Sequence, residues 1–217
     1  MVKTVVESLV QGLGQAFNEL KVERGEIGWY HQRKDGESFA RLDAAVRSAL
    51  LEAVETPDAF DKFTFFKDEH YVRNLVYQDD NFELLVLCWA PGQGSRIHNH
   101  GDSHGLGDRG ARPRGGDAGP AAPPAIPGVL AAVSPCPPLQ KLGKGVAGPG
   151  AQLYINDGQA LHAVRCADDT DYPHGAVTLH LYAPPTRRVL LYEPEQDRVV
   201  TRVPGHYSRD GKVVQQG

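Results

Sequence analysis

Short runs of β-branched and aromatic residues, separated by turn residues, limit the fold of this chain more than any other feature. Residues 71–77 and 82–89 are two such runs, and Asp79-Asp80-Asn81 between them predicts a β-hairpin. A glycine-containing turn then leads into a strand expected over residues 96–100. Strands at this spacing predict an antiparallel barrel or sandwich. Five further strands are expected after residue 150, at 152–155, 161–165, 176–182, 189–192 and 199–203.

The first sixty residues follow a helical period instead. Apolar residues recur three and four positions apart from Val6 to Leu20, and a second stripe from Leu42 to Ala53 ends before Pro57. A length of 217 residues suits one domain with a full core. We therefore predict a single mainly β domain over residues 1–217, with a helical part at 1–60 packed outside barrel strands in 61–104 and 151–205.

Residues 105–150 interrupt this pattern. They hold 11 of the 24 glycines and 9 of the 16 prolines, and they contain no aromatic residue, histidine or glutamate. Such a segment has little apolar bulk to bury and many chain breakers, so we predict a disordered insert rather than paired strands. Translation of a GC-rich sequence in a wrong frame, or of a retained intron, is our preferred explanation over a lineage-specific loop.

The composition narrows the classes of protein to consider. A net charge of −4 is too small and too negative for a protein that mainly binds nucleic acid or an anionic membrane. No apolar run approaches the ~20 residues of a membrane span, and the first ten residues lack a secretory apolar core. The widely spaced Cys88, Cys136 and Cys166 suggest reduced thiols. We expect a cytoplasmic monomer without nucleic-acid or membrane partners.

Histidines provide the first indication of chemistry. His98 and His100 stand two apart, so on a strand both rings point to one side. Alone, such a pair is more often a polar strand face than a metal site. A glycine turn before it and the turn that leads to His162 strengthen the metal hypothesis, because glycine-led His-x-His followed by a distant histidine resembles the cupin barrel.

The expected donor set carries no charge of its own. The glutamate that cupins commonly place four or five residues after the second histidine is missing here, where His104 and Gly105 stand. Three neutral imidazoles leave a metal with its full positive charge, which suits an anionic ligand such as a thiolate. This favours Fe(II) with a thiol over a hydrolytic zinc site, while leaving the latter open.

Two further groups fit a small amino-acid ligand. Arg73, on one strand face with Tyr71, offers a two-pronged contact for a carboxylate, although a lone arginine is usually a surface residue. Thr178, His180 and Tyr182 alternate with leucines and so share a face. They predict a relay that fixes the tyrosine hydroxyl, unless they are an incidental polar face.

Several of these motifs, in this order, resemble cysteine dioxygenase, a cupin-fold non-haem iron thiol dioxygenase. The similarity is close over residues 71–104 and 151–185 and looser elsewhere. The segments that carry it are Tyr71-Val-Arg-Asn-Leu-Val, Cys88-Trp89, residues 92–104, 154–162 and Ala176-Val-Thr-Leu-His-Leu-Tyr-Ala-Pro-Pro185.

The resemblance implies an enzyme that adds both atoms of O2 to the sulfur of cysteine, giving cysteine sulfinate, in cysteine catabolism and taurine biosynthesis. Fe(II) would be bound by His98, His100 and His162. Arg73, assisted by Tyr71, would hold the substrate carboxylate, and Tyr182, positioned by His180 and Thr178, would hydrogen-bond near sulfur and oxygen. His104 would support the site, and Ala183-Pro184 is a candidate cis bond.

Two departures from the family bear on activity. Gly105 replaces a cysteine that in many relatives is cross-linked to the tyrosine, so Tyr182 is expected to remain uncross-linked. Residues 105–150 do not resemble the family's strands, so we expect this chain to be less stable and less active than its relatives. The alternatives are a dioxygenase for another small thiol, such as 3-mercaptopropionate, and a non-catalytic cupin that binds a small ligand.

Overall fold

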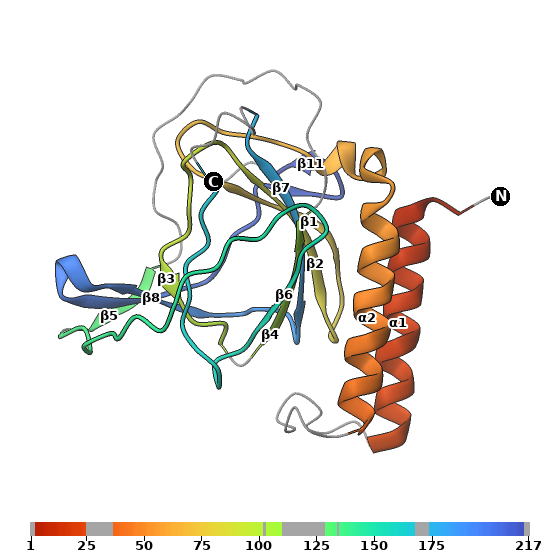
Figure 1. Ribbon diagram of the computed structural model, residues 1–217, viewed down its shortest axis with the longest axis horizontal. Helices are drawn as coiled ribbons and strands as arrows, with labels where there is room; N and C mark the ends of the chain where they lie inside the picture. Colours follow the sequence, from red (N-terminus) through yellow and green to blue (C-terminus); the bar gives the residue numbers. More distant parts are fainter. Residues whose placement is uncertain are drawn as a thin grey trace.

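Two antiparallel helices precede the β part of the molecule. The computed structural model describes residues 3–24, 37–101, 103–109, 129–133, 135–167 and 174–214. Helices α1 (Val5–Arg24) and α2 (Glu37–Val54) lie side by side against one side of the sheets, and the 3-10 helix η2 (Pro57–Phe63) follows (Figure 1). The predicted connection between the helices falls on residues 25–36, outside the described part. None of the described helices has the length and hydropathy that a membrane crossing requires.

The β part consists of two sheets. The larger has the order β11-β10-β1-β2-β7-β4-β6, and the smaller has the order β3-β8-β9-β5. All pairs are antiparallel except β1 with β10. The predicted mainly β class with outer helices is confirmed. The strands are β1 (Val72–Gln78), β2 (Glu83–Trp89), β3 (Ile97–His98), β4 (His104–Arg109), β5 (Val129–Val133), β6 (Gln152–Ile155), β7 (Ala176–Ala183), β8 (Val189–Glu193), β9 (Arg198–Arg202), β10 (Ser208–Arg209) and β11 (Lys212–Val213), with a 3-10 turn η3 (Pro194–Gln196).

The centre of the larger sheet separates an apolar side from a polar side. Strand β7 pairs with β2 along its length and with β4 on its other edge. Because side chains alternate along a strand, Leu179 and Leu181 join the core that the helices cover, where Leu13 and Leu50 are fully buried. The intervening polar side chains of β7 point to the opposite side.

Four of the segments discussed above differ from the sequence-based expectation. Residues 105–109 continue β4, and Val129–Val133 forms β5 against β9, although strands were not expected in this segment. Backbone groups on β7 and β9 need partners, and residues 129–133 are a run free of glycine and proline. Residues 161–165 form only isolated bridges, and the strand expected at 96–100 is limited to Ile97–His98.

Residues 110–128 and 134 of the proposed insert lie outside the described part. The prediction of disorder over 105–150 therefore stays a prediction for these residues. The Ala183-Pro184 peptide bond is cis, as expected.

Candidate metal and substrate site

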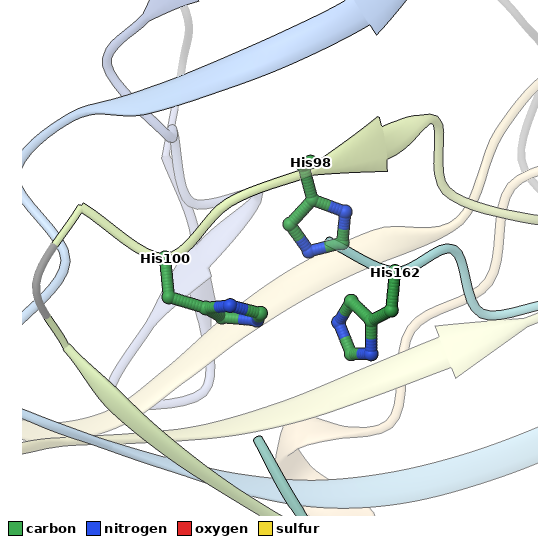
Figure 2. A group of neighbouring side chains, drawn as sticks. All are labelled: His98, His100 and His162. Carbon is green, nitrogen blue, oxygen red and sulfur yellow. The ribbon is translucent and has the colours of Figure 1, made fainter. Parts of the chain in front are cut away.

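Three histidine rings meet on the side of the larger sheet that the helices do not cover. His98 ends β3 and faces His162 across an isolated bridge, with N–H···O distances of 3.0 and 3.2 Å in the two directions. The ring centroids of His98, His100 and His162 lie 4.8 to 5.1 Å apart. Figure 2 shows the rings turned toward one shared space. The candidate ligand nitrogens all lie within 4.8 Å of one another, so one ion can be shared after small ring movements.

The three rings are held in the neutral form that a metal needs. Burial lowers the pKa of His98, lowers that of His100 to about 4 and lowers that of His162 to about 3. Nδ1 of His98 lies 2.8 Å from the Arg96 carbonyl oxygen, which can only accept, so this nitrogen carries the proton and Nε2 is free to ligate. Both ring nitrogens of His100 are buried without a hydrogen-bond partner among the described residues. This donor set fits a first-row metal ion.

Arg73 provides a half-buried cation near the histidines, with 17% of its side chain exposed. Its Nη2 lies 3.5 Å from Glu83 Oε1, and its guanidinium lies 5.6 Å from the ring centroid of Tyr182. Nε and Nη2 are buried, and neither has a hydrogen-bond acceptor in the described part of the chain. Buried N–H groups without acceptors are costly, so this side chain is suited to bind an incoming anion. Tyr71 stacks on Trp89 at 4.2 Å between centroids.

The predicted relay on β7 is present. His180 Nε2 lies 2.8 Å from Thr178 Oγ1, and its Nδ1 lies 3.2 Å from the Tyr182 hydroxyl. Burial, followed by the charge of Arg73, lowers the pKa of His180 to about 3. Burial raises the pKa of Tyr182 to about 12, although Arg73 opposes the shift. The pair is therefore neutral, and the tautomer of His180 decides whether the Tyr182 O–H points inward or toward a ligand.

The relay also has an anchor that the sequence did not indicate. Trp89 on β2 donates its indole N–H to Thr178 Oγ1 at 2.8 Å. Tyr182 stacks over His100 at 5.9 Å between centroids, which joins the relay to the histidine cluster.

Part of this chain is similar to proteins of a known family. Residues 36–108 match the family model described as cysteine dioxygenase type I. Cysteine dioxygenase type 1 from Danio rerio and from Homo sapiens are each 32% identical to the chain over 145 residues. Part of the chain is thus similar to the cysteine dioxygenases. The alignment spans 63% of this chain and 63% of each relative's length.

Solved structures with a similar arrangement are more distant in sequence. One is TT1209 from Thermus thermophilus, with a TM-score of 0.39, 17% identity, and coverage of 58% of this chain and 94% of that one. Another is an uncharacterized conserved protein with a double-stranded β-helix domain from Klebsiella pneumoniae, with a TM-score of 0.40, 15% identity, and coverage of 61% and 93%.

Gly105, which the resemblance identified as the replacement of a cysteine, lies next to Tyr182. It pairs with Tyr182 across β4 and β7, and a Cβ placed on it would lie 3.1 Å from Tyr182 Cε1. The structure thus puts this position directly against the tyrosine ring. With glycine there, Tyr182 has no thiol beside it from this position.

His104 faces helix α2 rather than the histidine cluster, in contrast to the supporting role that the resemblance implied. Its Nδ1 lies 2.5 Å from the Tyr154 hydroxyl, and its ring lies 5.5 Å from Phe39 of α2. The reason is the alternation along β4, because Gly105 faces Tyr182 while His104 faces the helices.

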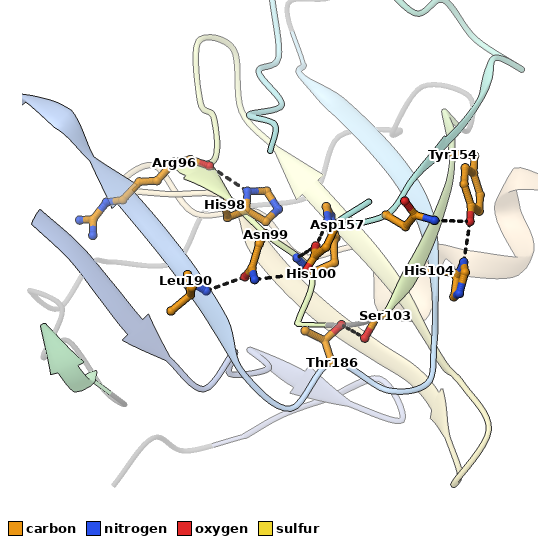
Figure 3. A network of polar contacts seen from close by, with 11 residues as sticks. Arg96, His98, Asn99, His100, Ser103, His104, Tyr154, Asp157, Thr186 and Leu190 are labelled. Atoms are coloured by element: carbon orange, nitrogen blue, oxygen red, sulfur yellow. Dashed lines mark hydrogen bonds and ion pairs between the residues drawn. The ribbon is translucent and has the colours of Figure 1, made fainter. Parts of the chain in front are cut away.

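Sequence reasoning missed three polar residues around this site. Glu83 is 1% exposed and lies beside Arg73, and its Oε2 is 3.4 Å from Nε2 of His206. Asn99 and Asp157 hydrogen-bond to each other beside the histidines (Figure 3). The one available signal was that Asn99 stands between His98 and His100, and that Asp157 lies in the turn before His162.

Proposed function

We propose that this chain is a thiol dioxygenase that uses Fe(II) and O2 to oxidise L-cysteine to cysteine sulfinate. One observation carries the proposal: three neutral imidazoles converge near Arg73, whose buried Nε has no hydrogen-bond acceptor among the described residues. The neutral ligand set suits a metal that must also accept a thiolate, and the arginine suits a carboxylate. The sequence similarity of part of the chain to the cysteine dioxygenases supports the same reaction.

The protein's own residues bind and orient the substrate. His98, His100 and His162 would hold Fe(II), which supplies a common centre for the thiolate and dioxygen. Arg73 would donate N–H groups to the substrate carboxylate, next to its contact with Glu83. Removal of water would strengthen the contact with the substrate.

Tyr182 would direct its hydroxyl toward the sulfur end of the substrate. When His180 donates from Nδ1 to the phenol oxygen, the Tyr182 O–H is free to donate outward. Thr178 would then donate to Nε2 of His180. The net reaction joins one thiol and one O2 to give one sulfinic acid, with both oxygen atoms on sulfur.

The test is oxygen consumption by the full chain reconstituted with ferrous iron. With cysteine we expect one sulfinate formed for each O2 consumed. Cysteamine lacks the carboxylate and should be a poor substrate, while 3-mercaptopropionate lacks the amine and tests the alternative of another thiol. Binding of cysteine without oxygen uptake would contradict the proposal and favour a ligand-binding cupin.

A second form of the chain tests the effect of residues 105–150. Replacing this segment by one of family-like composition should raise stability and turnover if the segment impairs the enzyme. Equal turnover of the two forms would contradict that impairment. We further propose a cytoplasmic monomer that acts in cysteine catabolism toward taurine.

A further inference from the structure

We infer that Asn99 and Asp157 are positioning residues that assemble the three-histidine site before a metal binds. The inference rests on the proposed function only in taking these histidines as metal ligands. Asn99 Nδ2 donates to Asp157 Oδ2 at 3.0 Å, and the His100 backbone N–H donates to Asp157 Oδ1 at 2.6 Å (Figure 3). Neither residue belongs to the group of candidate ligands.

The pair joins three segments that are far apart in the chain. Asn99 Oδ1 accepts the Leu190 N–H at 2.7 Å, and the Asn99 N–H donates to the Leu190 carbonyl at 3.2 Å, which fixes this residue to β8. Asp157 lies in the turn that leads to His162. A single side-chain contact therefore links the β3 segment, β8 and the His162 turn.

The Asn99–Asp157 contact matters most for the position of His100. His98 and His162 are already joined by their backbone bridge, whereas His100 lies beyond the end of β3. Directly after it, Gly101 adopts φ +57°, and a Cβ there would lie 2.1 Å from the Arg188 carbonyl oxygen. The chain thus turns sharply after His100, and the bond to Asp157 holds its backbone in line with the other two ligands.

Exchanging the amide and the carboxylate between positions 99 and 157 tests whether the hydrogen bonds of the pair or its charge control metal binding. In the Asn99→Asp variant two carboxylates face each other, so the contact is lost although negative charge is added. In the double variant Asn99→Asp with Asp157→Asn, the carboxylate at position 99 can accept from Leu190 N–H and from the amide at position 157. The amide oxygen at position 157 can still accept from His100 N–H. The double variant therefore keeps the three bonds and the original total charge.

The experiment measures Co(II) affinity by calorimetry, and the Co(II) absorption spectrum, in the wild-type, single and double variants. Outer residues that orient ligands change metal affinity by about 10- to 100-fold. We expect N99D to bind Co(II) at least about 10-fold more weakly, even though added negative charge alone would strengthen binding, and the double variant to return to within about 3-fold of wild type. Asp157→Asn provides a milder single variant if N99D does not fold, with circular dichroism as the check.

Each result either supports or contradicts the positioning role of Asn99 and Asp157. Weak single variants with recovery in the double variant support positioning. Single variants that bind Co(II) as tightly as wild type, or a double variant as weak as N99D, overturn it while leaving the metal site intact. If the wild-type chain itself binds no Co(II), the three-histidine site fails, and with it both the inference and the proposed function.

Discussion

The two sides of strand β7 show how one strand serves opposite requirements. On one side, Leu179 and Leu181 are 3% and 2% exposed and pack into the core under the helices. On the other, Thr178, His180 and Tyr182 form a hydrogen-bonded chain that reaches the histidine cluster. Successive residues thus belong to different environments.

The side of β7 that faces the helices contributes to stability, and the opposite side carries the groups of the proposed site. The helix side is apolar and closely packed, so its side chains contribute to folding free energy. On the site side, Nε and Nη2 of Arg73 and both ring nitrogens of His100 are buried without a hydrogen-bond partner among the described residues, although Nη2 lies 3.5 Å from Glu83. Such groups cost folding free energy and are available to ligands. Changes on the two sides should therefore have distinct consequences.

The largest expected effect is the loss of one histidine from the site side. His162→Ala removes one of three ligands and should lower Co(II) affinity by more than about 100-fold and abolish oxygen uptake with cysteine. Calorimetry measures the affinity, and the exposed His174→Ala is the matched control. Unchanged metal binding in H162A would remove the metal centre from this place.

A truncation on the helix side should act on stability alone. Leu181→Ala should lower the free energy of unfolding by about 2–5 kcal/mol, because it leaves a cavity in the core. Denaturant unfolding measures this, with Leu153→Ala as the control, since Leu153 is 58% exposed. If L181A also weakened Co(II) binding as strongly as H162A, the two sides would not be independent.

Arg73 should affect substrate binding more than metal binding. Arg73→Gln removes charge-assisted hydrogen bonds worth about 1.5–3 kcal/mol, so the KM for cysteine should rise by roughly 10- to 150-fold. Arg73→Lys keeps the charge but not the planar arrangement of donors, and should recover only part of the loss. The exposed Arg209→Gln is the control. A KM for cysteine that does not change would place the carboxylate elsewhere.

The smallest effect is a pH dependence of stability from His180. Its pKa is about 6.5 when unfolded and is lowered to about 3 by burial in the folded chain. Below the unfolded value the unfolded chain binds a proton that the folded chain excludes, so stability is lost as pH falls from 6.5 toward 3. His100 and His162 shift in the same direction.

Urea unfolding of the metal-free protein at pH about 7.5 and about 5.5 measures this loss. His180→Gln should reduce the difference between the two values, and His174→Gln should leave it unchanged. An equally steep pH dependence in H180Q would show that His180 contributes nothing to it.

The parts that the sequence could predict are those governed by local periodicity. The β1–β2 hairpin and strand β6 follow from short β-type runs bounded by turn residues, and the alternating side chains of β7 follow from a period of two. The convergence of His162 on His98 was predicted only through resemblance to a family, because the bridge joins residues far apart in the chain.

The parts that could not be predicted depend on partners distant in sequence. His104 was expected in the site from the family resemblance, yet one residue along β4 reverses the face. Strand β5 was missed because its pairing with β9 outweighs the glycine- and proline-rich surroundings. Glu83 and Asp157 are ordinary acids in the sequence and acquire roles only from Arg73 and Asn99 across the fold.

Trp89 gives the molecule an internal fluorophore in contact with two residues of the proposed substrate site. Its ring stacks on Tyr71, and its indole N–H donates to Thr178 at the start of the relay. The other tryptophan, Trp29, falls outside the described residues, and Trp29→Phe would leave Trp89 as the sole indole emitter. Titrating thiols into that variant should change the Trp89 emission as the thiol binds. This gives an optical measure of thiol binding that needs no turnover.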